Sequence, residues 1–216
     1  MIASLFNITF ITESCAFAAA IWFLRKKTTV WQLFIPLLLV TIFVETLGWW
    51  LVVVERKSSN SIIYNLLMIV TDLFSFWILS HAEPLLNKKK MFLWLMIAFA
   101  IFAIFNLAAF QGPWQYNGYT ELLGDLLLAV LCCYFFYLLL REESDRDLVR
   151  YEYFWLANGF LFSALGSAVL YIFIDPLTAF YRQSGVNVYA YINYLLNVLL
   201  YGSLILAFIC RYRNTK

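Results

Sequence analysis

Long runs of apolar residues alternate with short polar links along the whole chain. A membrane-spanning helix needs about 20 consecutive, mostly apolar residues, and seven runs reach that length. The runs cover residues 3–24, 30–54, 61–82, 91–110, 119–140, 153–174 and 188–210. This pattern predicts an all-α fold, in which residues 1–216 form a single domain: a polytopic membrane bundle of seven transmembrane helices.

The links between the runs are short and polar; the one after the sixth run reads DPLTAFYRQSGVN. Short links make consecutive helices antiparallel neighbours. They also leave no room for a soluble catalytic module, so chemistry or recognition is expected inside the bundle, at its ends, or through a partner protein.

Composition supports a membrane location. Of the 216 residues, 64% are hydrophobic and 13% are charged, whereas soluble domains carry roughly 25% charged residues. The mean hydropathy of +0.80 exceeds what a soluble core of this length could hide. We therefore predict a multi-pass integral protein of the cell membrane, or of the inner membrane in a bacterium, with lipids as its surroundings.

Basic residues are distributed unevenly among the links. Three lie in the links after the second, fourth and sixth runs: Arg56, Lys57 and Arg182. Twelve lie in the other links and at the C-terminus: Arg25, Lys26, Lys27, Lys88, Lys89, Lys90, Arg141, Arg146, Arg150, Arg211, Arg213 and Lys216. Loops rich in lysine and arginine stay in the cytoplasm, so we predict an external N-terminus and a cytoplasmic C-terminus. The net charge of +2 gives no reason to expect a nucleic-acid partner.

The runs contain carboxylates but no lysine or arginine. Glu13, Glu45, Asp72 and Asp125 lie within runs, and Glu121 lies near the start of one. Charged groups in lipid are costly and usually face a bundle interior or a wet cavity. With the predicted orientation, four of these acids fall in the outer half and Asp72 near the middle. Asn65 and Asn193 fall in the outer half as well, so the seven residues are predicted to line one acidic, ligand-binding cavity.

Three states of the buried acids remain open. They can be protonated and hydrogen-bonded, they can hold a cation, or they can sit in water. Glu121 and Asp125 are one helical turn apart, so either one of the two is protonated or a cation bridges them. Glu121 could also lie on the surface, where it would favourably meet the helix N-terminus.

The sequence offers little for catalysis. It has one histidine, and its four cysteines are dispersed, so neither a zinc site nor a serine–histidine pair is predicted. We assign no catalytic residue, no metal ligand and no cofactor, and we favour a protein that is not an enzyme.

Three function classes remain. The first is a sensor or receptor-like protein that binds a small, cationic or protonatable ligand in the outer half and signals to a cytoplasmic protein partner at its basic face. The second is a small-solute or proton-coupled transporter, for which Asn158, Ser163, Ser167 and Asn197 are the polar candidates in the inner half. The third is an intramembrane enzyme that acts on lipid through carboxylates.

Overall fold

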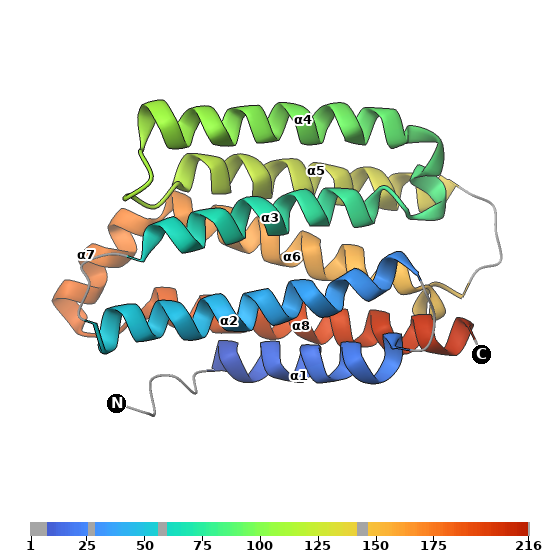
Figure 1. The fold of residues 1–216 in the computed structure, drawn as a ribbon, viewed down its shortest axis with the longest axis horizontal. Helices are drawn as coiled ribbons and strands as arrows, with labels where there is room; N and C mark the ends of the chain where they lie inside the picture. The colour runs from blue at the N-terminus through green and yellow to red at the C-terminus, as the bar shows by residue number, and fades with distance from the viewer. Residues whose placement is uncertain (1–7, 26–28, 56–59, 142–146, 216) are drawn as a thin grey trace.

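The computed structural model describes residues 8–25, 29–55, 60–141 and 147–215. Within these ranges the chain is helical and contains no strand (Figure 1). The eight α-helices are α1 Ile8–Leu24, α2 Phe34–Val53, α3 Ser61–Leu79, α4 Lys89–Phe105, α5 Gly118–Arg141, α6 Glu152–Ile172, α7 Ile174–Ser184 and α8 Val188–Asn214. Short 3-10 segments precede α2, α4 and α6, and a π-helical turn, Asn106–Phe110, extends α4. The expected all-α fold class is confirmed.

Six helical stretches are long and apolar enough to cross a membrane. They are Val30–Val53, Ser61–Leu79, Glu83–Phe110, Gly118–Arg141, Glu152–Ile172 and Val188–Asn214. They indicate a multi-pass membrane protein. The remaining predicted span is the first one, residues 3–24, which corresponds to α1. The 17 described residues of α1 fall short of the usual spanning length, and residues 3–7 of that predicted span lie outside the described ranges. The count of seven spans and the single-domain assignment therefore stay predictions.

The helices alternate in direction (Figure 1). The starts of α1, α3, α5 and α8 lie at one end of the bundle, which we call the Ile8 end. The opposite end holds the C-terminus of α8, and we call it the Arg211 end. The helix α8 runs to Asn214, four residues beyond the predicted limit, so Arg211 belongs to the helix and not to a tail.

Six helices form a closed ring. Helix α1 packs against α2 and α8, α2 against α3, α3 against α5, α5 against α6, and α6 against α8. Helix α4 lies outside this ring, against α3 and α5 (Figure 1). The interior of the ring is where side chains of six helices can meet.

The short helix α7 was not predicted, because its residues were assigned to a polar link. It has 11 residues with mixed polar and apolar side chains, too few to span a membrane, and it lies across the Ile8 end (Figure 1). Gly185 ends it with a left-handed backbone, φ 72°, a conformation that glycine adopts without steric cost. As a result, the chain turns directly into α8.

An aromatic core fills the half of the ring nearest the Arg211 end. We define it as Trp31, Phe34, Phe74, Tyr153 and Phe208. The ring of Trp31 is fully buried, and its centroid lies 5.0 Å from that of Tyr153 and 5.6 Å from that of Phe34. Phe34 in turn meets Phe74 at 4.9 Å and Phe208 at 5.2 Å. The contacts of Trp31 with Tyr153 and of Phe34 with Phe74 and Phe208 are edge-on, which is a favourable geometry for aromatic rings.

Candidate functional site

The structure places the predicted acids in one half of the bundle. Glu13 lies in the second turn of α1, Glu121 and Asp125 lie in the first two turns of α5, and Glu45 lies in the second half of α2, which points toward the Ile8 end. Asp72 lies near the middle of α3. The five acids fall into two clusters, so the single chamber expected from the sequence is replaced by two acidic groups side by side along the same half.

The first acid cluster consists of Glu13, Glu45, Tyr64 and Tyr201, from four different helices. The Tyr201 hydroxyl donates to Glu13 Oε1 at 3.1 Å, and the Tyr64 hydroxyl donates to Glu45 Oε2 at 3.0 Å. The two glutamates are electrostatic neighbours. Glu13 is 2% exposed, and its Oε2 is buried without a hydrogen-bond partner among the described residues.

The second acid cluster consists of Asp72, Glu121 and Asp125, which are mutual electrostatic neighbours. Asp72 reaches α5 at Gly124, where its Oδ2 occupies the space that any larger residue's Cβ would need. Asp72 Oδ2 and Asp125 Oδ2 are both buried without a hydrogen-bond partner in the described part of the chain. This glycine is therefore what allows the α3 carboxylate to approach the α5 carboxylates.

A cavity of about 40 Å³ lies beside Glu121. Its lining comes from α5, α6, α7, α8 and the 111–117 link: Tyr116, Glu121, Ser167, Leu170, Tyr171, Ile174, Tyr189 and Asn193. Glu121 thus lies at a cavity and is half-buried, which answers the question whether it is a plain surface residue. The predicted residue Asn193 lines the same cavity.

One of the tyrosines beside Glu121 is Tyr116, in the link before α5. Its burial and the adjacent Glu121 carboxylate raise the pKa of Tyr116 above its ordinary value, although 44% of the residue's surface is exposed. The hydroxyl therefore keeps its proton and serves Glu121 as a hydrogen-bond donor.

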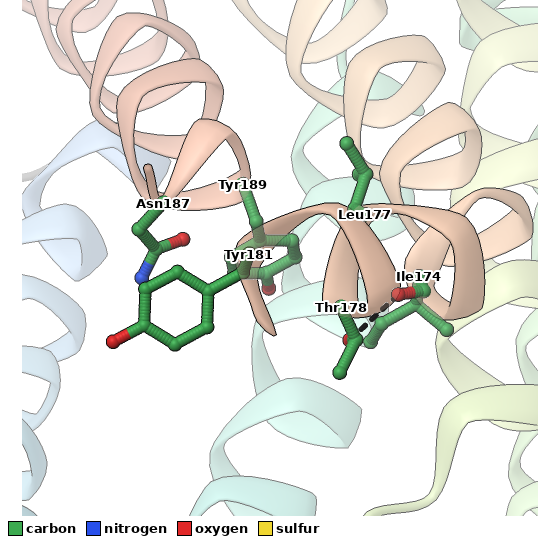
Figure 2. A pocket seen from close by; sticks show the side chains of 6 residues that line it. All are labelled: Ile174, Leu177, Thr178, Tyr181, Asn187 and Tyr189. Carbon is green, nitrogen blue, oxygen red and sulfur yellow. Dashed lines mark hydrogen bonds between the residues drawn. The ribbon is translucent and has the colours of Figure 1, made fainter. Parts of the chain in front are cut away.

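The structure has a second cavity, of about 210 Å³, whose lining side chains are drawn in Figure 2. It lies between α7 and the start of α8, and it is lined by Ile174, Leu177, Thr178, Tyr181, Asn187 and Tyr189. Ile174 and Tyr189 line both cavities. The two spaces are therefore neighbours, with the acidic one deeper and the more apolar one at the Ile8 end.

Asn65 belongs to a different set of contacts. Its Nδ2 donates to the Gln115 carbonyl at 2.8 Å, and its Oδ1 accepts from the Asn117 backbone N–H at 2.9 Å. Asn117 also bonds to Asn106, whose Nδ2 donates to Thr120 Oγ1 at 3.0 Å. The structure thus gives Asn65 a structural task, which is to hold the link that carries Tyr116.

The Arg211 end carries a partly buried ion pair that sequence analysis did not find. Arg211 Nη1 donates to Glu152 Oε1 at 2.8 Å, and Asn214 Nδ2 donates to Glu152 Oε2 at 2.8 Å. Glu152 is 5% exposed. Both residues lie at the margins of predicted runs, where charges are normally solvated, and only the length of α8 brings them together.

Three further site residues were missed or misplaced. Tyr116 and Tyr189 were not among the predicted site residues, and Ser167 was assigned to the inner half. That assignment was wrong, because α6 runs toward the Ile8 end and Ser167 lies near its last turn. The direction of α6 and α8 puts Ser167 and Tyr189 toward the Ile8 end, and this direction is the sequence signal that could have found them.

Nothing in the described ranges favours a metal centre, since no three histidine, cysteine, aspartate or glutamate residues there lie close enough to share an ion. The ligand-binding role of the seven predicted residues stays a prediction.

Comparisons with protein-family models, with curated proteins and with solved structures return no match. The six long apolar helices define the class, a multi-pass membrane protein, and any finer function has to be inferred from the site itself.

Proposed function

We propose that the protein is a membrane receptor or sensor that binds a small organic amine in the cavity beside Glu121. The observation that carries this proposal is the pairing of a carboxylate with several tyrosines around a small cavity next to two further acids. The proposal retains seven spans, with α1 as the first, and places the N-terminus and both cavities on the outer side, as the basic residues favour.

The lining of the cavity suits a cation. An ammonium group can pair with the Glu121 carboxylate through charge-assisted hydrogen bonds, which contribute roughly 1.5–3 kcal/mol each. The faces of Tyr116, Tyr171 and Tyr189 can add cation–π attraction of about 0.5–2 kcal/mol. Asp72 and Asp125 are two further carboxyl groups next to Glu121.

The sizes of the cavities favour a small ligand. The 40 Å³ cavity holds an ammonium head group, and the adjoining 210 Å³ cavity has apolar side chains for a short tail. Both are below the roughly 300 Å³ typical of pockets for drug-sized ligands. A primary amine with a short alkyl or aryl group fits this description.

The opposite half of the bundle supports reception over transport. A transported amine needs polar groups on both sides of the middle, and the aromatic core fills the ring there. Of the polar candidates for an inner path, Asn158 donates to a carbonyl of its own helix, whereas Asn197 lies in the first half of α8, on the Ile8 side. A cytoplasmic partner protein would then bind at the basic Arg211 end and respond to a movement of the helices there.

The test is binding of primary alkylamines to the purified protein in detergent, measured by calorimetry and by thermal stabilisation. Alcohols of the same chain length serve as ligand controls. Glu121→Gln is expected to weaken amine binding by about 10- to 100-fold, the equivalent of roughly 1.4–2.7 kcal/mol. Glu55→Gln is the matched control, because Glu55 is exposed and should leave affinity unchanged.

Two results would overturn the proposal. If amines and alcohols bind equally well, the charge of the ligand does not contribute to binding. If Glu121→Gln and the unaltered protein have equal affinity for the amine, the Glu121 carboxylate is not part of the binding site. Amine flux into proteoliposomes that depends on Glu121 would replace the receptor by a transporter that uses the same cavity.

A further inference from the structure

The first acid cluster takes no part in the amine site, yet it contains Glu13, the acid with the smallest exposed surface among the described residues. Glu13 is 2% exposed. Its carboxylate has one hydrogen bond, from Tyr201, and its second oxygen, Oε2, is buried with no partner in the described part of the chain. An ionised carboxylate in such a place would bear a desolvation cost of several kcal/mol.

The groups around Glu13 cannot neutralise it. Helices α2 and α8 pack against α1, and the titratable groups that face Glu13 are Glu45 and the hydroxyls of Tyr64 and Tyr201. Glu45 repels a second negative charge, and each tyrosine already donates its single proton to a carboxylate. No lysine, arginine or histidine is among these neighbours.

From this geometry we infer that the first acid cluster is a proton-binding site: one proton from solvent occupies Glu13 Oε2, while Glu45 stays ionised. The assignment of the proton to Glu13 follows from exposure, because Glu45 is only half-buried and receives the Tyr64 hydroxyl. A bound proton leaves Glu13 neutral and ends the repulsion between the two glutamates. The proton also converts Oε2, which has no hydrogen-bond partner in the described ranges, into a neutral hydroxyl group.

The site has a structural consequence. Tyr201 and Glu13 tie α8 to α1, and Tyr64 and Glu45 tie α3 to α2. Loss of the proton would place two like charges between these helix pairs. The bound proton therefore acts as a structural ligand of the ring at its Ile8 end.

The experiment is infrared difference spectroscopy of the purified protein at neutral pH in H₂O and D₂O. A protonated carboxyl has a C=O stretching band that shifts in D₂O, and subtraction of the Glu13→Gln spectrum from that of the unaltered protein should leave one such band. Tyr201→Phe should move the band to higher frequency, because the hydrogen bond to the carbonyl oxygen is lost. Glu55→Gln, at an exposed acid, should leave the spectrum in this region unchanged.

Each contrary result counts against the site. A folded Glu13→Gln variant with an unchanged carboxyl region would show that Glu13 is ionised. A band that disappears in Glu45→Gln but persists in Glu13→Gln would move the proton to the other acid. Loss of the band when sodium chloride replaces choline chloride would make the cluster a sodium site. None of these readouts depends on amine binding, so the proposed receptor function can fail while the proton site stands.

Discussion

The two halves of the ring are stabilised by different contacts. Near the Arg211 end, the rings of Trp31, Phe34 and Phe208 pack against each other, and the buried atoms without a partner in the described ranges are two nitrogens, Trp31 Nε1 and Arg211 Nε. Near the Ile8 end, carboxylates, tyrosines and amides meet, and three carboxylate oxygens there, Glu13 Oε2, Asp72 Oδ2 and Asp125 Oδ2, are buried without a partner in the described ranges.

This difference separates stability from function. In lipid, helices are held together by close packing and by interhelical hydrogen bonds, and the contacts of the aromatic half are between packed rings. Carboxylates inside a membrane protein are costly and usually have a function. We therefore expect substitutions in the aromatic half to change mainly stability, and substitution of the Glu121 carboxylate in the acidic half to change binding more than stability.

The largest expected effect is on the aromatic half. Trp31→Ala removes the ring at the centre of the core and should lower the free energy of unfolding by about 3–5 kcal/mol. Trp22→Ala is the matched control, because Trp22 is 78% exposed and faces away from the ring. The measurement is reversible denaturation in detergent; equal losses for the two variants would remove the distinction between core and lipid-facing tryptophans.

The next effect concerns the amides at the Ile8 end. Asn65→Ala leaves the Gln115 carbonyl and the Asn117 N–H without their partner, at about 1–3 kcal/mol per buried group. We expect a loss of about 2–4 kcal/mol in stability together with weaker amine binding, since Tyr116 is on this link. Asn197→Ala, whose amide bonds only within α8, should change little; a neutral Asn65→Ala would show that the link needs no anchor.

A smaller effect is expected for the ion pair at the Arg211 end. Glu152→Gln weakens two short contacts to a buried acid and should cost about 1.5–3 kcal/mol. Asp147→Asn affects an ion pair whose side chains are 56% and 83% exposed, and exposed pairs contribute about 0–1 kcal/mol. The melting temperatures of Glu152→Gln and Asp147→Asn at low and high salt test this difference. Equal shifts in melting temperature for the two variants would show that the Glu152 ion pair is no better shielded from solvent than the Asp147 pair.

The smallest effect tests the approach of Asp72 to α5. Gly124→Ala places a methyl group where Asp72 Oδ2 lies, and overpacking of this kind costs about 1–3 kcal/mol, partly offset by the better helix propensity of alanine. Gly202→Ala, with no atom within 4 Å of the new methyl group, should be neutral or stabilise by up to about 1 kcal/mol. If Gly124→Ala is as benign as Gly202→Ala, the carboxylate does not occupy this space.

Several elements followed from the sequence with little error. Residue 152 begins α6, one residue from the prediction, and Gly118 begins α5, also one residue away, because a change from polar links to apolar runs marks where a chain leaves water. The sequence also predicted that the acids lie in the same half of the bundle. This was possible because consecutive helices alternate in direction, so the order of the helices gives the direction of each. The limit of α8 was missed, because Arg211 reads as the end of an apolar run.

What the sequence determined by itself is the class of protein, the helical order and the half of the bundle in which the acids lie. These depend on apolar length and chain direction, which are local properties. Only the tertiary structure decided that the acids form two clusters, that Asn65 holds a link, that Ser167 joins the acidic half and that Arg211 meets Glu152. The physical reason is that periodicity gives the face of a helix but not its neighbour, and contacts between side chains depend on which helices pack together and at what height.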